Sequence, residues 1–285
     1  MSSKALHLKA EQLATGLPPL LLRARRLAAS VSAGAHGRRR PGSGDEFWQF
    51  RHSVPGDPAT AIDWRQSAKS DHLYIRESEW TVAQTTRLWV DPSASMRWRS
   101  RPELEQKLDR ALLLAVALAI LLEQAGERIG LLDRPGPAFY GRTAPTRLAL
   151  ALLAAAPSGD WPAGSRHSGP VLLMSDFLLP LEQLAEHMRR WSALGLSGHF
   201  LQILDPAEQD LAYAGRVRLR GLEQEGDVLL DRAESLRGAY AAHYARHQSG
   251  VAAIARQAGW RYELHLTSQP ARAALTHLHA ALGRG

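Results

Sequence analysis

From residue 85 to the C-terminus, short apolar runs alternate with longer stretches whose apolar residues recur at helical spacing. The spacing predicts strands at 88–91, 128–133, 171–176, 199–205 and 261–267. It predicts helices at 102–126, 143–156, 181–195, 236–258 and 270–282. Strands that alternate with helices in this way indicate an α/β fold, with a mainly parallel sheet covered by helices on both faces. Residues 216–220 and 227–230 are typical of a hairpin, and Phe139-Tyr140 of a further, antiparallel strand.

The first 84 residues follow a different pattern. Residues 5–33 have helical spacing interrupted at Pro18-Pro19, which predicts two short helices or one kinked segment. A loop rich in glycine and arginine follows at 34–44. The aromatic and β-branched pieces at 47–51, 61–64 and 73–76 are separated by turn residues and predict extended structure. We therefore expect an N-terminal helical segment at 1–36, a β-rich subdomain at 37–84 and the α/β domain at 85–285.

The composition excludes several classes of protein. The chain has 285 residues, of which 45% are hydrophobic, and it has no cysteine, so disulfides, zinc–thiolate sites and cysteine nucleophiles are excluded. The longest apolar run, 111–122, is shorter than the ~20 residues of a membrane span. Lys4, Lys9 and Glu11 interrupt the N-terminus where a secretory signal would be apolar. The sequence predicts a soluble, cytoplasmic protein without a membrane span.

The net charge of +7 favours an acidic partner or a nucleic acid. Apart from the cluster at 38–40 and a looser group at 23–26, however, the arginines are scattered. No helix-turn-helix, zinc or aromatic-platform pattern accompanies them, so we expect no nucleic acid partner.

One acid and two hydroxyls follow the first strand of the α/β domain, in the run Asp91-Pro92-Ser93-Ala94-Ser95. Ligands of α/β sheets bind beyond the carboxyl ends of the strands, so Asp91, Ser93 and Ser95 should face one point. Oxygen ligands of this kind suit Mg²⁺, which keeps several waters and binds few protein groups. The same residues are also common in turns, so the run alone is weak evidence for a metal.

Other chemistry lacks support in the sequence. There is no Walker loop, no Gly-x-Gly-x-x-Gly and no nucleophile elbow, which argues against ATP hydrolysis, dinucleotide binding and serine hydrolysis. His243 and His247 lie one helical turn apart but lack the glutamate of a zinc protease motif, and we interpret them as surface residues.

The run Asp-x-Ser-x-Ser at 91–95 resembles the first half of the metal-ion-dependent adhesion site (MIDAS) of von Willebrand factor A-type domains, although Pro92 and Ala94 stand where glycine is frequent. The second half of that motif requires a threonine and an aspartate. The resemblance implies Asp176 as the acid and Thr143, in Gly141-Arg142-Thr143, as the threonine, with Thr146 as the alternative. It implies Mg²⁺, or another divalent cation such as Mn²⁺, with one position open for a carboxylate from a partner.

A longer series of motifs precedes this run. Residues 37–47, Arg51, Pro55-Gly56-Asp57 and residues 62–69 stand in order ahead of Asp91, and together they resemble domain-of-unknown-function family 58. The resemblance extends from about residue 37 to residue 176. It implies a Rossmann-like, doubly wound von Willebrand factor A-type domain with a β-rich addition. It also implies a MoxR-type AAA+ ATPase as partner, in a chaperone-like system that remodels or activates client proteins.

Three other interpretations compete with this one. Asp91 and Asp176 are possible helix caps, which would remove the metal site. A metal-dependent hydrolase could use the same oxygens, although such sites often need two cations and a positioned base. Nucleic acid binding through the arginine-rich loop ranks last. The expected function is a non-enzymatic, metal-dependent protein-interaction module.

Overall fold

The computed structural model describes residues 3–34, 47–54, 57–70, 72–78, 83–134, 136–211, 213–221 and 226–282. The chain divides into two compact units, one formed by Met1–Gly34 with Gln84–Gly285 and the other by Ala35–Ala83. The N-terminal helix thus belongs to the larger unit, whereas the sequence predicted a separate segment at 1–36. The loop predicted at 34–44, with its arginine cluster, lies outside the described residues after Gly34.

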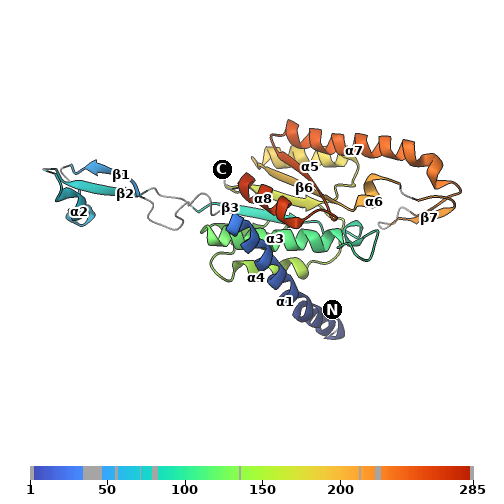
Figure 1. Cartoon of the computed structure of the whole chain (residues 1–285), viewed down its shortest axis with the longest axis horizontal. Coiled ribbons are helices and arrows are strands. Elements are labelled where there is room, and N and C mark those ends of the chain that lie inside the picture. The colour runs from blue at the N-terminus through green and yellow to red at the C-terminus, as the bar shows by residue number, and fades with distance from the viewer. Residues whose placement is uncertain are drawn as a thin grey trace. The chain divides into compact units, whose positions relative to one another are not determined.

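A five-stranded sheet forms the centre of the larger unit (Figure 1). Its order is β4-β3-β5-β6-β9, and all neighbouring strands are parallel. The strands are β3 (Thr85–Val90), β4 (Arg128–Leu131), β5 (Val171–Ser175), β6 (Gly198–Leu204) and β9 (Arg261–Leu266). An antiparallel bridge between Ile129 and Phe139 lies at the β4 edge, where the sequence predicted an antiparallel strand. The predicted mixed α/β fold with a mainly parallel sheet is confirmed.

Helices cover both faces of this sheet (Figure 1). One face packs against α3 (Lys107–Gln124), α4 (Ala144–Leu153) and α8 (Ala271–Leu282), and the other against α5 (Leu181–Ala193) and α7 (Arg237–Gln257). Side chains alternate along each strand, so Leu88 and Val90 enter the first core while Trp89 enters the second. Burial on both faces is the reason that these strands are apolar without interruption.

Helix α3 is apolar on all sides because it is enclosed by other elements. It contacts α1, α4, α8 and the sheet, and every residue from Ala111 to Leu122 is buried. The helix begins at Lys107, five residues after the predicted start, because residues 102–106 form turns and Gln106 is its N-cap.

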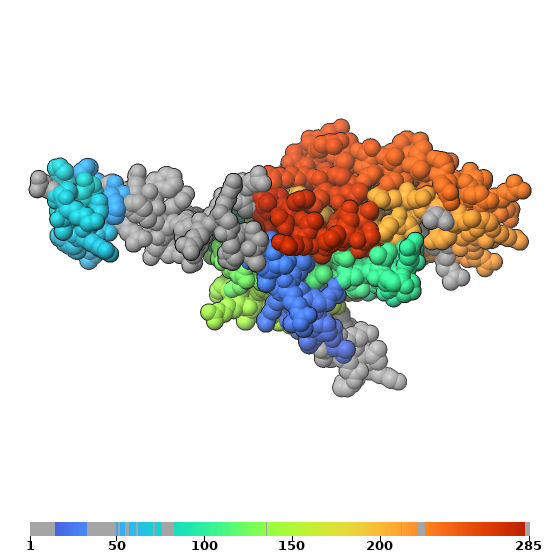
Figure 2. All heavy atoms as spheres, viewed as in Figure 1, coloured from blue at the N-terminus to red at the C-terminus, as the bar shows by residue number. Residues whose placement is uncertain are grey.

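Helix α1 runs from Ser3 to Gly34 as one element and contains Pro18 and Pro19. The sequence had predicted a break or a kink there, since an interior proline costs roughly 3 kcal/mol. After the prolines, a stripe of small and aliphatic residues lies buried against α3, α4 and α8: Leu20, Ala24, Ala28 and Val31. In Figure 2 the part of α1 that is drawn in blue lies against α8 and the α3–α4 region. Tertiary packing of this stripe supports the helix despite the prolines.

The smaller unit contains an antiparallel pair, β1 (Phe47–His52) and β2 (Tyr74–Ser78). The piece predicted as extended at 61–64 is different: a 3₁₀ turn, η1 (Ala59–Ala61), leads to a short helix, α2 (Trp64–Ser67). The Asp63 side chain caps this helix by accepting from the Gln66 amide. Only Ile62 bridges to the sheet, opposite Ile75.

The remaining elements of the larger unit lie near the carboxyl ends of the strands or follow them. They are η2 (Ser95–Arg97), α6 (Pro206–Gln209), the antiparallel pair β7 (Val217–Arg220) and β8 (Asp227–Leu230), and η3 (Ala233–Leu236). No helix among the described residues combines the length and the apolar content that crossing a membrane requires.

Two neighbouring alanines of α1 test its packing. Ala28 is 1% exposed within the core, and the adjacent Ala29 faces solvent. We expect Ala28→Leu to lower the free energy of unfolding by about 2 kcal/mol, because the filled core must move to accept the larger side chain. Ala29→Leu, the matched control, should change it by less than about 0.5 kcal/mol. Urea denaturation measures both, and equal effects would show that α1 does not pack as described.

Candidate metal centre

Asp91 and Asp176 meet because their strands are neighbours. β3 and β5 pair in register with Val90 opposite Met174, and the next residues along each strand leave the sheet at the same edge. The Asp91 amide donates to the carbonyl oxygen of Met174 at 2.9 Å. The chain passes from β3 to β4 on one side and then returns to β5 on the other, so this is the point where the strand order reverses. Ligands of open α/β sheets bind at such a point.

Hydrogen bonds connect the four oxygen-bearing residues that we call the oxygen cluster: Asp91, Ser93, Ser95 and Asp176. The Ser93 amide donates to Asp91 Oδ1 at 2.9 Å, and the Ser93 and Ser95 hydroxyl oxygens are 3.1 Å apart. Ser95 Oγ donates to Asp176 Oδ2 at 2.6 Å. A fifth residue, Ser175, donates from its Oγ to Asp91 Oδ2 at 2.6 Å. The structure therefore brings together four of the five predicted ligands.

A buried lysine adjoins the cluster. Lys107, at the start of α3, is fully buried, and its Nζ donates to Asp176 Oδ2 at 2.9 Å and to Glu208 Oε1. Burial alone would lower the pKa of Lys107, but the carboxylates of Asp176 and Glu208 outweigh burial and raise it. The Lys107 ammonium is thus held charged between the two acids.

Asp91 has no such counter-charge. Burial and the nearby Asp176 carboxylate raise the pKa of Asp91 from 3.8 to about 6, although hydrogen bonds from Ser175 and Ser93 oppose the shift. Asp176 and Glu208 share the single Lys107 ammonium, and Asp91 adds a third carboxyl group that pairs with no cation among the described residues. An excess of buried negative charge favours a bound cation.

The backbone after Asp176 is strained. Phe177 has a φ of 53°, and among the described residues it is the only one other than glycine with a positive φ. Its amide donates to Ser175 Oγ at 2.9 Å, and its carbonyl oxygen lies 2.8 Å from His247 Nε2 on α7. Phe177 itself is fully buried. Such strain persists only where the surroundings hold it, and it is common at functional sites.

A cavity of about 240 Å³ opens over the oxygen cluster. All four residues of the cluster line it, together with Gly159, Trp161 and the loop at 178–180. Trp161 packs against the aromatic core, with its ring tilted and 4.8 Å from that of Trp89 and 5.5 Å from that of Phe177. This anchoring holds the 154–170 loop across the carboxyl edge of the sheet, with Gly159 at the cavity.

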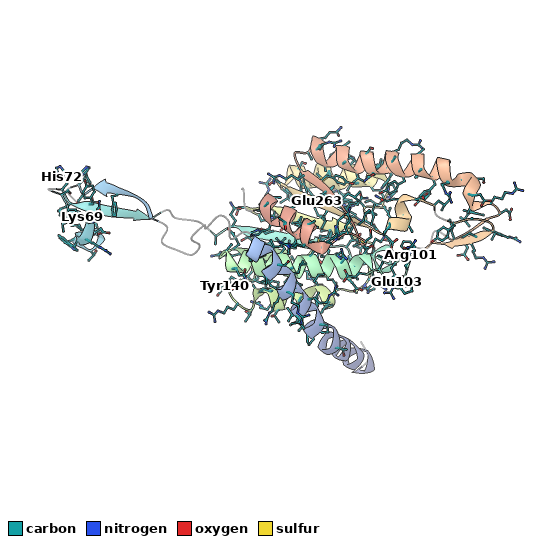
Figure 3. The ribbon with its side chains drawn as sticks, in the orientation of Figure 1. Lys69, His72, Arg101, Glu103, Tyr140 and Glu263 are labelled. Carbon is teal, nitrogen blue, oxygen red and sulfur yellow. The ribbon has the colours of Figure 1, made fainter. Side chains whose placement is uncertain are left out.

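The structure does not bring Thr143 to the cluster. Phe139 pairs antiparallel with Ile129, so the chain runs back toward the amino ends of the strands before α4 begins. In Figure 3, Tyr140 lies at the opposite end of the sheet from Arg101 and Glu103, which follow β3. Thr143 is the exposed N-cap residue of α4, and the alternative, Thr146, lies in its first turn; neither lines the cavity. The placement thus corrects the prediction of a threonine ligand.

The oxygen atoms of the cluster are of the kind that hard cations prefer. No group of three or more histidine, cysteine, aspartate or glutamate side chains is placed to hold a metal within the described part of the chain. Two carboxylates and two hydroxyls suit a hard cation that keeps most of its water, which is the behaviour of Mg²⁺. The Ser95 hydroxyl donates to Asp176, so its oxygen acts as an acceptor toward its other neighbours, as a cation ligand must. A tightly enclosed transition-metal site does not fit these residues.

The structure also changes two alternative interpretations, the aspartates as helix caps and His247 as a surface residue. Neither aspartate caps a helix, because the N-cap of η2 is Ala94 and that of α5 is Pro180. Each aspartate accepts one hydrogen bond from the backbone amide two residues later. The other oxygen of each accepts from a serine hydroxyl, that of Ser175 for Asp91 and that of Ser95 for Asp176. His247 is half-buried against the strained loop and is not a simple surface residue.

Sequence reasoning missed Lys107 and Glu208. Lys107 stands just before the apolar run 111–122 of α3 and is the only lysine of that helix, which was a signal for a buried ion pair. Glu208 lies in α6, where it completes a capping box with Asp205, and nothing in its spacing points to Lys107. Only the packing of α6 beside the start of α3 reveals the contact between Glu208 and Lys107.

Comparison with known proteins gives a family and several relatives. The family model described as "Protein of unknown function DUF58" matches residues 49–250. The chain is 28% identical over 268 residues to uncharacterized protein Rv1480 of Mycobacterium tuberculosis (strain ATCC 25618 / H37Rv), covering 87% of this chain and 83% of that protein. The uncharacterized protein Mb1516 of Mycobacterium bovis shows the same identity and coverage.

Two solved structures are similar over 72% of this chain and 100% of theirs. One is an aerotolerance-related membrane protein from Bacteroides fragilis NCTC 9343, with 12% identity and a TM-score of 0.45. The other is the conserved hypothetical protein BatB from Bacteroides thetaiotaomicron, with 13% identity and a TM-score of 0.40. These likenesses are too remote to carry an inference about this chain.

Lys107→Met tests the buried ion pairs. We expect the free energy of unfolding to fall by about 3 kcal/mol, because Asp176 and Glu208 lose their shared counter-charge while remaining buried. Arg189→Met removes an exposed cation and should change it by less than about 0.5 kcal/mol. Urea denaturation in the presence of EDTA measures both, and a loss below about 1 kcal/mol for Lys107→Met would contradict the charge balance described here.

Asp91→Asn tests the electrostatic cost of the second carboxylate. Because the pKa of Asp91 is about 6 in the folded protein and near 3.8 when unfolded, its ionised form destabilises the fold above pH 6, and this cost disappears as the pH falls toward 4. In EDTA at pH 7.5 we expect Asp91→Asn to be the more stable protein by about 2 kcal/mol. The difference should shrink at pH 5, as measured by urea denaturation at both pH values. If the stability difference between Asp91→Asn and the wild type grows on acidification, the raised pKa of Asp91 is refuted.

Proposed function

Because the chain belongs to the family of proteins of unknown function DUF58, we propose a function from its site: a non-enzymatic, metal-dependent protein-interaction module. The larger unit is, in this proposal, a von Willebrand factor A-like domain. The oxygen cluster binds Mg²⁺, or a similar divalent cation such as Mn²⁺, in the manner of a MIDAS. The single observation that carries the proposal is the gathering of Asp91, Ser93, Ser95 and Asp176 on one cavity at the point where the strand order reverses.

The ligand chemistry supports a role in binding. A divalent cation held by two aspartates, with Lys107 also paired to one of them, keeps residual positive charge, and a carboxylate from another protein can complete its coordination. The cavity of about 240 Å³ has room for one such side chain.

The surface beside the cavity suits an acidic partner. Leu178, half exposed, lies between the cavity and a neighbouring hollow, which is lined by His243, Arg246 and His247 of α7 and by one acid, Glu182. Helix α7 carries no aspartate or glutamate. An acidic segment with an apolar residue would contact both the cation and this face.

The proposed partner is a MoxR-type AAA+ ATPase, with which the module would act on client proteins as an adaptor in chaperone-like remodelling or activation. A carboxylate of the ATPase or of the client would reach the cation. The metal would therefore control assembly and would not itself carry out a reaction.

Metal binding is tested by thermal unfolding. We expect Mg²⁺ to raise the melting temperature of the whole chain by about 4 °C for each tenfold excess over its dissociation constant. Asp91→Asn and Ser95→Ala should largely abolish this rise, because the first removes a negative charge from the ligand set and the second removes a hydroxyl oxygen. The exposed Asp231 offers a control, since Asp231→Asn should respond to Mg²⁺ as the wild type does. An identical rise in all four proteins would exclude the oxygen cluster as the site.

The interaction is tested with the purified MoxR-type ATPase of the same organism, immobilised and incubated with this protein. Binding should require Mg²⁺, be lost in EDTA and be weakened at least about tenfold by Asp91→Asn, which removes a ligand of the bridging cation. Retention that is equal with Mg²⁺ and with EDTA would reject the metal bridge.

A further inference from the structure

A second cavity, of about 580 Å³, lies at the amino ends of the strands, at the opposite edge of the sheet from the oxygen cluster. Thr85 and Arg128, the first residues of β3 and β4, line it, and Ser168 shortly before β5 does too. Tyr140, labelled in Figure 3 at this end of the sheet, is a further lining residue and is 71% exposed. The function proposed above uses none of these residues.

Every charged side chain that lines this cavity is basic. Arg87 and Arg128 line it, together with His167, and no acidic residue does. Within the described ranges, neither arginine forms an ion pair with an acid. Positive charge that is partly removed from water without a counter-charge is costly, and it favours an anion.

The geometry of Arg87 holds its guanidinium at the cavity. The side chain lies across Gly130, where a Cβ atom would come within 3.1 Å of Arg87 Nη1. Nη1 donates to the carbonyl oxygen of Leu131 at 2.9 Å, and the buried Nε has no partner. One hydrogen bond therefore orients a planar guanidinium and leaves most of its donor capacity unused.

His167 adds a second unsatisfied group. Its Nδ1 lies 2.9 Å from the Ser165 carbonyl oxygen, which can only accept, so Nδ1 carries the proton. The Nε2 atom is buried and has no partner. His167 therefore adds a polar group without a partner, among the described residues, beside the two arginines.

We propose that this cavity is an oxyanion-binding site, with a phosphoryl group as the preferred ligand. Arg87 and Arg128 supply charge and paired N–H donors, which match the oxygens of phosphate or carboxylate. The exposed Tyr140 contributes a phenol at the rim. The site is separate from the oxygen cluster, so it stands or falls independently of the metal proposal.

Isothermal titration of the whole chain with inorganic phosphate, at ionic strength held constant with sodium chloride, tests the site. We expect saturable binding that Arg128→Gln weakens about tenfold, since a charged hydrogen bond is lost. Arg128 is exposed at the start of β4, so this variant should fold. The control is Arg142→Gln, which removes an exposed arginine outside the cavity and should leave binding unchanged.

Three outcomes would overturn the proposal: no saturable binding up to about 10 mM phosphate, equal weakening by both substitutions, or binding that Arg87→Gln leaves intact. Competition by acetate distinguishes the two ligand classes. If acetate displaces phosphate, the group recognised is a carboxylate; if it does not, the group is phosphoryl. Either result supports an oxyanion site, and neither depends on Mg²⁺.

Discussion

The carboxylates of Asp91 and Asp176 share a buried site at the carboxyl ends of the strands, where burial and the charge of Asp176 raise the pKa of Asp91. Hydrogen bonds from Ser175, Ser93 and Ser95 hold them there. The ammonium of Lys107 offsets part of the charge, but it is shared with Glu208. An imbalance of this kind is costly for stability, and it persists most readily where a site must bind something positive. The cation proposed here would relieve it.

The elements around this site hold it in place from both faces of the sheet. Lys107 reaches it from α3 on one face, and His247 contacts the strained Phe177 from α7 on the other. Trp161 fixes the crossing loop in the aromatic core. The site is therefore built on packed elements rather than on free loops, which favours a pre-organised geometry with little adjustment on binding.

Side chains of opposite charge gather at the two ends of the parallel strands. Acids gather where the strands end, around Asp91 and Asp176, and basic groups gather where they begin, around Arg87 and Arg128. A cation and an anion can therefore be recognised at separate ends of one domain. The two cavities share no lining residue, so the two proposed sites are distinct.

The sequence alone determined the order of strands and helices, the parallel sheet and the meeting of Asp91 with Asp176. The physical reason is that burial on both faces demands uninterrupted apolar strands, and that acids just beyond two such strands emerge at one edge. Local spacing could not place Thr143, because the antiparallel turn at Phe139 reverses the chain before α4. Nor could it decide between two short helices and one kinked segment at Pro18-Pro19, because the single helix α1 depends on packing against α3. The bonds of Lys107 to Asp176 and Glu208 join residues far apart in the chain, so only the tertiary structure decided them.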